Sequence, residues 1–456
     1  MAQQTLTFMV RCAAVRAWEN TSYCVVNALA GIPQRVSVTS VQQDGMRRQD
    51  ESINLMRTIF LLDIDCFFAS VEMALHPELR GTPLCIGGRR GDRGIVACPN
   101  YEARAYGVKT AMPLRTAERL LPPNAVFLPG DHHLYGEYSE RVMNILYDFT
   151  PDIEQVSIDE AYLDVTGCLH LWNCNPLRMA AAIQECIRHE CGLTVSIGIA
   201  SNKVCAKIAA GLKKPCGLVM VPSGGEKEFL APLPIEVVPG VGKKTLPKLH
   251  ARGIMTIADV LNRKMPTHSW IGLYLSAVAR GNDERIVHGN HVERSISRDT
   301  TFNHDTNDSA FIASITYHLA ERCCKTLRKR ALCASTVMVK VRFADFTTVQ
   351  KQTRLDIATA NEEDIVAAAR QMLLALLPND RLVRLVGVKV SHFIPADHAG
   401  SQMVLGITGR EKLATLHHRL DALQEKYGNT VVWWGITHPI QQIVRDRGER
   451  YGPHPS

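Results

Sequence analysis

The stretch LLDIDCFFASVE, from Leu61 to Glu72, carries two acids, Asp63 and Asp65, inside an apolar run. The apolar residues around these acids predict a buried strand that turns into the next element. Buried carboxylates are costly unless they are paired or bind a metal ion. The stretch therefore indicates a charged site at the end of a buried strand.

A second stretch of the same character, VSIDEAYLDV, runs from Val156 to Val165 and carries Asp159 and Glu160 side by side. Two acid-bearing strands could place Asp63, Asp159 and Glu160 on one edge of a sheet. Carboxylate oxygens are the ligands that Mg²⁺ takes, with waters and substrate phosphates completing its coordination. The two stretches together predict a divalent-cation site, and two unrelated strands with surface acids are the alternative.

Composition limits the kind of protein. A chain of 456 residues is long enough for several domains, and 46% hydrophobic residues are typical of a globular protein with a real core. No apolar run has the length of a membrane span, so we expect no membrane partner. The net charge of +7 permits nucleic-acid binding without establishing it. The 14 cysteines include no C-x-x-C pair, which indicates free thiols in a reducing cytosol.

Residues 1–55 differ from the rest, because their second half is polar and no clear periodicity runs through them. We expect a poorly ordered N-terminal extension. The sequence MRTIFLLDID begins at Met56, directly before the acid strand, so the extension is predicted to be dispensable.

The segment RGIVACPNYEARAYGVKTAMPL predicts a short buried strand over Gly94–Cys98 and a helix from about Tyr101. Tyr101 and Arg104 would share one face of this helix. Such a face can hold a triphosphate, because an arginine guanidinium can donate two parallel hydrogen bonds to phosphate oxygens. An ordinary exposed arginine beside a half-buried tyrosine is the alternative.

Helical spacing predicts helices over 131–148 and 175–190, followed by a strand in LTVSIGIASN. The stretch KVCAKIAAGLKKPCG, residues 203–217, predicts a helix with a basic side that Pro215 and Gly217 end. A lysine at its end, near the acid strands, would help to neutralise a triphosphate. A solvated lysine face is the usual alternative.

The segment PIEVVPGVGKKTLPKLHARGI, from Pro234 to Ile254, places Gly240 and Gly242 in a tight turn between two short helices. Backbone N–H groups can converge at such a turn, and Lys243 and Lys244 follow at once. The pattern matches a helix-hairpin-helix, which binds the DNA backbone without reading bases. A plain helix-turn-helix connection is the alternative.

The polar residues 285–300 predict a linker to a last domain. There, helices are predicted over 309–330 and 361–377, with strands in STVMVKVRF and RLVRLVGVKVSHF. From Arg294 to Ala396 there are 15 lysines and arginines against 10 acids. A half-buried sheet whose outer face carries cations suits a duplex backbone, whereas an ordinary mixed surface is the alternative.

Seven segments occur in the order seen in Y-family, lesion-bypass DNA polymerases, and the chain resembles this family, in particular its bacterial DNA polymerase IV type. They are LLDIDCFFASVE, VACPNYEARAYGVKTAMP, SIDEAYLDVTG, SIGIASNKVCAKIAAGLKKPCG, the PGVG turn, RSISRDTTF and RLVGVKVSHF.

The resemblance implies an α+β multidomain fold, a right-hand polymerase with palm, small fingers, helical thumb and an α/β little-finger domain. We expect the palm over 56–72 and 131–223, fingers over 73–130, a thumb with the helix-hairpin-helix over 224–285, a linker over 286–298, the little finger over 299–396 and a tail over 397–456.

The resemblance also implies residue roles. Asp63, Asp159 and Glu160 are the catalytic residues and ligands of two Mg²⁺ ions, with the Ile64 backbone carbonyl as a further ligand. Phe68 takes the steric-gate position, where its ring would exclude a ribose hydroxyl. The triphosphate contacts fall on Phe67 (backbone), Cys98, Tyr101, Arg104 and Lys214, although relatives often have a hydroxyl residue where Cys98 stands.

For partners, the resemblance implies primer-template DNA, deoxynucleoside triphosphates and a sliding clamp, bound by a monomer. Gly240, Gly242 and Lys243 would contact the DNA backbone. The sequence QMVLGI resembles the clamp-binding peptide that usually ends such polymerases, although here further residues follow it; its predicted contacts are Gln402, Met403, Val404 and Leu405.

The function implied is template-directed, low-fidelity DNA synthesis past damage, without proofreading. Two other classes compete. A catalytically silent DNA-binding relative would lack a metal carboxylate, yet all three are present. A nucleotide cyclase also uses a two-acid palm, but it needs neither the hairpin nor the basic last domain.

Overall fold

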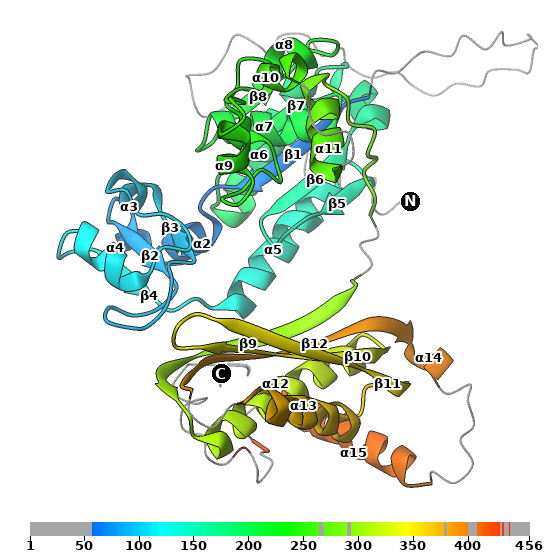
Figure 1. Cartoon of the computed structure of the whole chain (residues 1–456). Helices are drawn as coiled ribbons and strands as arrows, with labels where there is room; N and C mark the ends of the chain where they lie inside the picture. Colours follow the sequence, from blue (N-terminus) through cyan, green and yellow to red (C-terminus); the bar gives the residue numbers. More distant parts are fainter. Residues whose placement is uncertain are drawn as a thin grey trace, which may run out of the picture. The chain divides into compact units, whose positions relative to one another are not determined.

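The computed structural model describes residues 57–263, 269–289, 293–377, 381–399, 408–428, 431–432 and 437. The predicted N-terminal extension, 1–55, and the predicted clamp-binding residues, 402–405, lie outside these ranges. The chain divides into two units, Met1–Asn290 and His291–Ser456 (Figure 1). Each unit has a hydrophobic core of its own. In the described part of the chain, no helix has the length and apolar character needed to cross a membrane.

A five-stranded sheet with strand order β5-β6-β1-β7-β8 forms the centre of the first unit. Its strands are β1 (Ile59–Ile64), β5 (Ile153–Gln155), β6 (Glu160–Asp164), β7 (Val195–Ala200) and β8 (Leu218–Met220). Strand β1 pairs antiparallel with β6 and with β7, and β7 pairs parallel with β8. The acid stretches of the sequence therefore lie on neighbouring strands.

Both faces of β1 are covered, because successive side chains point to opposite sides of a sheet. Phe60, Leu62 and Ile64 pack in one cluster with residues of α5 (His132–Tyr147) and α6 (Pro176–Cys191). On the other side, β1 packs with α7 (Lys203–Leu212). Helix α2 (Phe67–Leu75) directly follows β1.

The helices predicted over 131–148 and 175–190 are confirmed as α5 and α6. Helix α5 begins where it does because the Asp131 carboxylate accepts the backbone N–H of His133 and of Leu134, at 3.0 and 3.2 Å. Helix α7 ends at Leu212 rather than near Gly217, because Pro215 disfavours helical backbone before it.

A small three-stranded sheet of order β3-β2-β4 follows α2 and a short 3-10 helix, η1 (Pro77–Leu79). Its elements are β2 (Leu84–Ile86), β3 (Cys98–Pro99), α3 (Tyr101–Ala105), α4 (Leu114–Leu120) and β4 (Val126–Leu128). The strand predicted over Gly94–Cys98 is wrong in extent, because Ile95 and Val96 instead pair with Pro113 and Met112.

Short helices complete the first unit; the one over Thr166–Trp172 packs in the cluster of α5 and α6, and the others share a core with α7. They are η2 (Thr166–Trp172), α8 (Glu226–Leu230), η3 (Ile235–Val237), α9 (Leu246–His250), α10 (Ile257–Asn262) and α11 (Trp270–Ala279). Of these, η2 follows β6, and the other five form the region predicted as the thumb.

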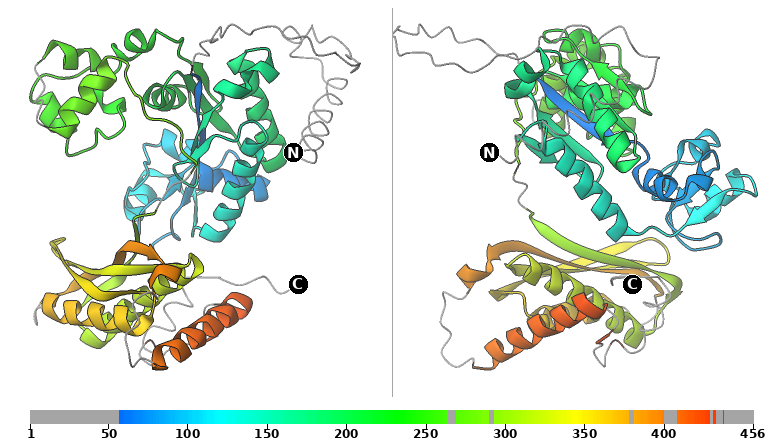
Figure 2. Two further views of the ribbon diagram at one scale, coloured as in Figure 1. Left: turned by 90° about the vertical axis from the view of Figure 1, so that its right-hand side faces the viewer. Right: turned by 180° about the vertical axis from the view of Figure 1, so that it is seen from behind.

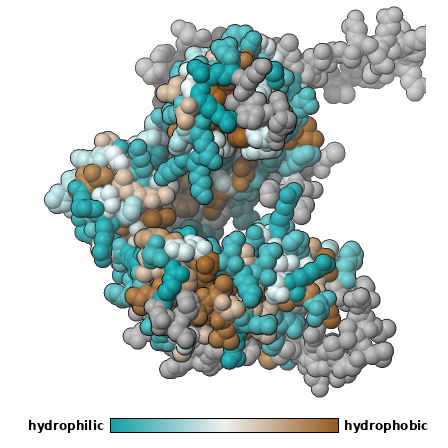
Figure 3. Space-filling view, in the orientation of Figure 1, coloured by the Kyte–Doolittle hydropathy of each residue, from teal (hydrophilic) through white to brown (hydrophobic). Residues whose placement is uncertain are grey.

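The second unit is a four-stranded antiparallel sheet of order β11-β10-β12-β9 with helices on one face (Figure 1). Its elements are β9 (Ser295–Thr306), α12 (Ser309–Lys329), β10 (Leu332–Phe343), β11 (Thr348–Thr359), α13 (Glu362–Leu376), β12 (Val383–Pro395), α14 (Ala396–Ala399) and α15 (Thr408–Tyr427). Helices α12 and α13 share one core with the sheet, and α15 lies beside them (Figure 2). Hydrophilic residues predominate on the surface visible in Figure 3.

Candidate active site

The acids from the two stretches meet at one end of β1 and β6. Asp63 is the register partner of Glu160 across the antiparallel pair. The backbone N–H of Ile64 donates to the carbonyl oxygen of Asp159 at 2.9 Å. Residues far apart in the sequence are therefore held side by side by backbone hydrogen bonds.

Each of these carboxylates has a side-chain partner. Lys214 donates to Asp63, Lys207 donates to Glu160, and the Ser157 hydroxyl donates to Asp159 at 2.5 Å. Burial raises the pKa of Asp63, Lys214 lowers it, and Asp159 and Glu160 raise it again. Asp63 is thus repelled by the two neighbouring acids, and a bound cation would relieve this repulsion.

The donor set fits Mg²⁺, which prefers hard carboxylate oxygens. Among the residues that the structure describes, no three His, Cys, Asp or Glu side chains are gathered as tightly as a bound ion would require. Asp63 instead forms an ion pair with Lys214, and Glu160 forms one with Lys207, so these two ammonium groups balance the negative charge.

Asp65, the second acid of the first stretch, has a different environment. It is fully buried, and its carboxylate accepts three hydrogen bonds: from Tyr101 Oη at 3.3 Å, from Ser196 Oγ at 2.8 Å and from the Cys216 backbone N–H at 2.7 Å. These donors come from α3, β7 and the loop after Lys214. Asp65 thus ties three segments together around the acids, and its oxygens are already occupied.

Phe68 lies in the first turn of α2 and is only partly buried. Its ring stacks on the ring of Tyr135, with centroids 4.3 Å apart and an interplanar angle of 13°, and meets His132 edge-on at 5.6 Å. Tyr135 is fully buried and donates from its hydroxyl to Glu72 Oε1 at 2.7 Å. The ring of Phe68 is therefore held in one orientation by α5.

The other predicted nucleotide contacts lie around α3. The Arg104 guanidinium lies 5.3 Å from the centre of the Tyr101 ring, and its Nε donates to Pro99 O at 3.0 Å. Arg104 also lines a cavity of about 250 Å³ with Lys109. Cys98 is buried, which raises the pKa of its thiol, and it interacts with the backbone N–H groups of Ala69 and Phe68. The predicted contact residues of α2, α3 and the 214–217 loop are thus linked through Cys98 and Asp65.

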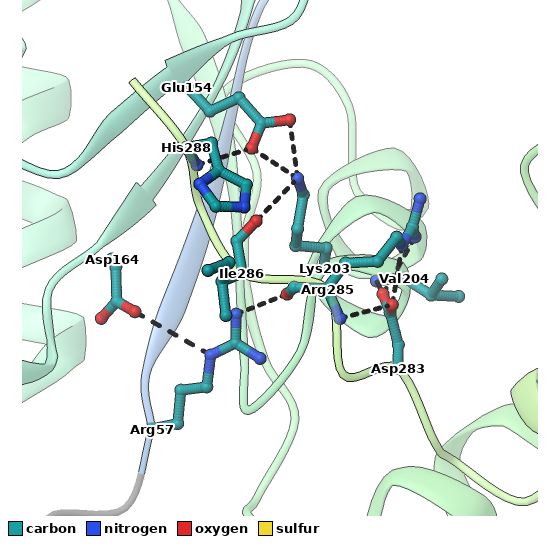
Figure 4. A network of polar contacts seen from close by, with 9 residues as sticks. All are labelled: Arg57, Glu154, Asp164, Lys203, Val204, Asp283, Arg285, Ile286 and His288. Carbon is teal, nitrogen blue, oxygen red and sulfur yellow. Dashed lines mark hydrogen bonds and ion pairs between the residues drawn. The ribbon is translucent and has the colours of Figure 1, made fainter. Parts of the chain in front are cut away.

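A polar network that no sequence motif predicted fastens the residues after α11 to the sheet (Figure 4). The buried Lys203 donates to both oxygens of Glu154 on β5, at 2.7 and 2.6 Å, and the His288 N–H donates to Glu154 at 2.9 Å. Asp283 accepts the Val204 N–H of α7 at 3.0 Å. The first three residues of the predicted linker, 286–288, are thereby attached to the first unit.

The predicted DNA-backbone residues lie at the turn between η3 and α9. Gly240 has a φ of 92°, which favours glycine, and Gly242, Lys243 and Lys244 are exposed. The Gly242 carbonyl accepts the N–H groups of Thr245 and Leu246, each at 2.9 Å, so the turn leads straight into α9. The lysines stand next to a backbone turn that is open to solvent.

In the second unit, the sheet face away from α12 and α13 is polar. Lys340 and Arg342 on β10 alternate with the buried Val339 and Val341, which gives the half-buried sheet with an outer cationic face that the sequence predicts. Lys340 pairs with Asp299 of β9, whose carboxylate lies over Gly387 where a Cβ would collide with it. This face remains cationic, because the same-face positions of β11 and β12 add Arg354 and Lys389.

Comparisons with known proteins agree with this architecture. The impB/mucB/samB family matches residues 62–211, the C-terminal domain of that family matches 293–404, and its HHH motif matches 223–254. The chain is 41% identical over 397 residues to a DNA polymerase IV of Dehalococcoides mccartyi (strain CBDB1), covering 85% of this chain and 99% of the relative. It is 37% identical over 379 residues to a DNA polymerase IV of Desulfatibacillum aliphaticivorans, covering 82% and 95%.

Solved structures lead to the same class. A Y-family DNA polymerase chimera, Dbh-Dpo4(243-245)-Dbh, superposes with a TM-score of 0.67 at 30% identity over 74% of this chain and 99% of that chain. DinB from Sulfolobus solfataricus gives a TM-score of 0.52 at 30% identity over 73% and 98%. The fold is that of a Y-family DNA polymerase. The chain belongs to the impB/mucB/samB family, and the predicted family and fold class are confirmed.

Proposed function

We propose that this chain is a DNA-directed DNA polymerase that copies damaged templates by two-metal nucleotidyl transfer, with Asp63, Asp159 and Glu160 as its metal ligands. The register of β1 and β6, which sets Asp63 opposite Glu160, is the observation that carries the proposal. The relatives of the chain are named DNA polymerase IV, and a related solved structure is an insertion ternary complex of a DNA polymerase.

Two Mg²⁺ ions, when bound, would activate the primer 3′-hydroxyl and stabilise the charge on the departing pyrophosphate. Asp63, Asp159 and Glu160 would hold these ions, with the Ile64 backbone carbonyl as a further ligand. Lys214, which pairs with Asp63, brings positive charge to the side where a triphosphate would enter.

Nucleotide selection falls to residues of α2 and α3. Phe68, whose ring is held by stacking on Tyr135, presents the edge of that ring to the sugar and excludes a 2′-hydroxyl. Tyr101 and Arg104 contact the triphosphate, together with the Phe67 backbone and Cys98. The small sheet and two short helices around them fit the small fingers that the family resemblance implies, and on this resemblance we propose loose selection and bypass of damage without proofreading.

Duplex DNA would be held by backbone contacts. The turn at Gly240 and Gly242 with Lys243 offers N–H groups and charge to one phosphate backbone, and the cationic sheet face of the second unit suits another. We further propose that the polymerase acts as a monomer, and that residues 402–405 bind a sliding clamp. Deletion of residues 402–407 should then abolish stimulation by the clamp and leave basal synthesis unchanged.

Primer extension with Mg²⁺ tests the proposal. Wild-type protein should extend a primer opposite a defined template lesion. The double variant Asp159→Ala, Glu160→Ala should bind primer-template with unchanged affinity and extend nothing, whereas Glu185→Gln, at an exposed acid of α6, should extend normally. Retained extension by the double variant would show that the metal ligands lie elsewhere.

A further inference from the structure

The hairpin that joins β10 to β11 in the second unit presents an aromatic ring to solvent. Residues 344–347 form its tip, closed by hydrogen bonds from Phe343 N–H to Thr347 O at 2.9 Å and from Phe346 N–H to Phe343 O at 3.0 Å. Phe346 is 63% exposed. Its φ is 65°, in the left-handed region that bulky residues rarely adopt. An exposed ring at a strained position indicates a use beyond packing.

Neighbouring side chains fix this tip. The Arg384 guanidinium of β12 lies 4.5 Å from the centre of the Phe346 ring, and Arg381 lies 3.7 Å from that of the buried Phe343. Arg381 also pairs with Asp345 at 2.8 Å, and Asp345 accepts the Thr347 N–H at 2.9 Å. The ring is therefore presented by a braced turn rather than by a loose loop.

The charges around the ring favour a nucleic acid as its partner. Arg342, Arg381 and Arg384 surround the tip, against two acids, Asp345 and Asp305, of which Asp305 lies 3.9 Å from Arg384. The open sheet face continues from the tip with further cations. An aromatic ring with arginines beside it is the arrangement on which bases of single strands stack, because every base has a π-face and the cations attract its phosphates.

We propose that Phe346 is a stacking platform for an unpaired base of the template strand, with Arg384 holding the ring and the neighbouring phosphate. The inference rests on the proposed function, since it requires that the chain binds primer-template DNA. It adds a base contact to a unit for which only backbone contacts were inferred.

Binding of two DNAs by the full chain tests this contact: a primer-template with a single-stranded template overhang that carries 2-aminopurine, and a blunt duplex of the same paired length. Phe346→Ala should weaken binding of the overhang DNA roughly 5- to 100-fold and abolish quenching of 2-aminopurine, with the blunt duplex unaffected. Phe346→Trp should retain both. Phe346→Leu keeps an apolar side chain without a ring and should behave like Phe346→Ala. Unchanged binding of the blunt duplex by both variants guards against a loss caused by unfolding.

Leu374→Ala is the matched control, since Leu374 is 67% exposed on α13, on the covered side of the sheet. Equal losses on both DNAs, or unchanged binding of the overhang DNA by Phe346→Ala, would overturn the inference and leave the polymerase proposal standing. Failure of the wild-type protein to bind either DNA would instead overturn the proposed function.

Discussion

Asp63 faces Glu160 directly across the antiparallel ladder of β1 and β6. Backbone hydrogen bonds between β1 and β6 fix this pairing, so the two residues stay close in every side-chain rotamer. Each is balanced by a lysine. Burial raises the pKa of Asp63, Lys214 lowers it, and repulsion from Asp159 and Glu160 raises it again. A bound cation would remove that repulsion.

Mg²⁺ should therefore stabilise the folded protein. A ligand at 100 times its dissociation constant adds about 2.7 kcal/mol, which corresponds to a rise of about 5 °C in Tm for a unit of this size. Thermal unfolding with and without Mg²⁺ should show this rise in wild-type protein and lose it in Asp63→Asn. The exposed-acid variant Glu185→Gln should keep it; an identical rise in Asp63→Asn would place the ion elsewhere.

Asp65 should act on nucleotide binding rather than on the chemical step. Asp65→Asn keeps the size of the side chain but leaves one of three buried donors unsatisfied, at a cost of about 1–3 kcal/mol. Because Tyr101 and the loop after Lys214 lose their anchor, KM for the incoming nucleotide should rise roughly tenfold with kcat nearly unchanged.

Tyr101→Phe removes one of those hydrogen bonds and should raise KM by a smaller factor in steady-state extension assays. A collapse of kcat in Asp65→Asn with KM unchanged would instead identify Asp65 as a metal ligand. The split between KM and kcat thus separates a positioning role from a catalytic one.

Phe68 should set sugar selection. Phe68→Ala removes the ring that stacks on Tyr135, so incorporation of ribonucleotides relative to deoxynucleotides should rise roughly 10- to 100-fold, as expected when a steric contact is lost. Single-nucleotide insertion assays measure this ratio. Phe68→Tyr keeps a flat ring and is the matched control; unchanged selection in Phe68→Ala would assign the gate to another residue.

The sequence predicted the elements better than the contacts between them. Helices α5 and α6 carry local signals, namely helical spacing and the capping residues Asp131 and Asn175. The order of the motifs indicated that Asp63 and Glu160 meet. No comparable motif predicted the hydrogen bond between Tyr135 and Glu72. Such pairs are decided by the packing of α5 on α2, which periodicity does not encode.

The ion pair of Lys203 and Glu154 should contribute to the stability of the first unit. Lys203 is buried, so Lys203→Met leaves a carboxylate whose remaining donor is the His288 N–H and should cost about 3–5 kcal/mol. Lys203→Met with Glu154→Leu should recover part of this loss, since it removes both charges. Urea unfolding of the single and double variants gives the coupling free energy; a value near zero would mean that the pair is not formed in solution.

Glu362 should make the second unit lose stability as pH rises. Its carboxylate accepts a hydrogen bond from the Arg328 guanidinium at 2.9 Å. The same guanidinium donates to Asp421 of α15 at 2.6 Å. Burial raises the pKa of Glu362 from 4.5 to about 7, although Arg328 opposes the rise. The folded state therefore binds this proton more tightly than the unfolded state. As pH rises from 4.5 to 7, the free energy of unfolding of the second unit should fall by at most about 3 kcal/mol.

Glu362→Gln should remove this pH dependence. Burial lowers the pKa of the neighbouring His417, whose contribution runs in the opposite direction, so the informative quantity is the difference between wild-type protein and variant at each pH. Hydrogen exchange of α12 and α13 between pH 5 and 8, corrected for intrinsic rates, measures it. Glu425→Gln, at an exposed pair with Lys329, is the control, and the hypothesis fails if both variants differ from wild-type protein by a constant amount across this range.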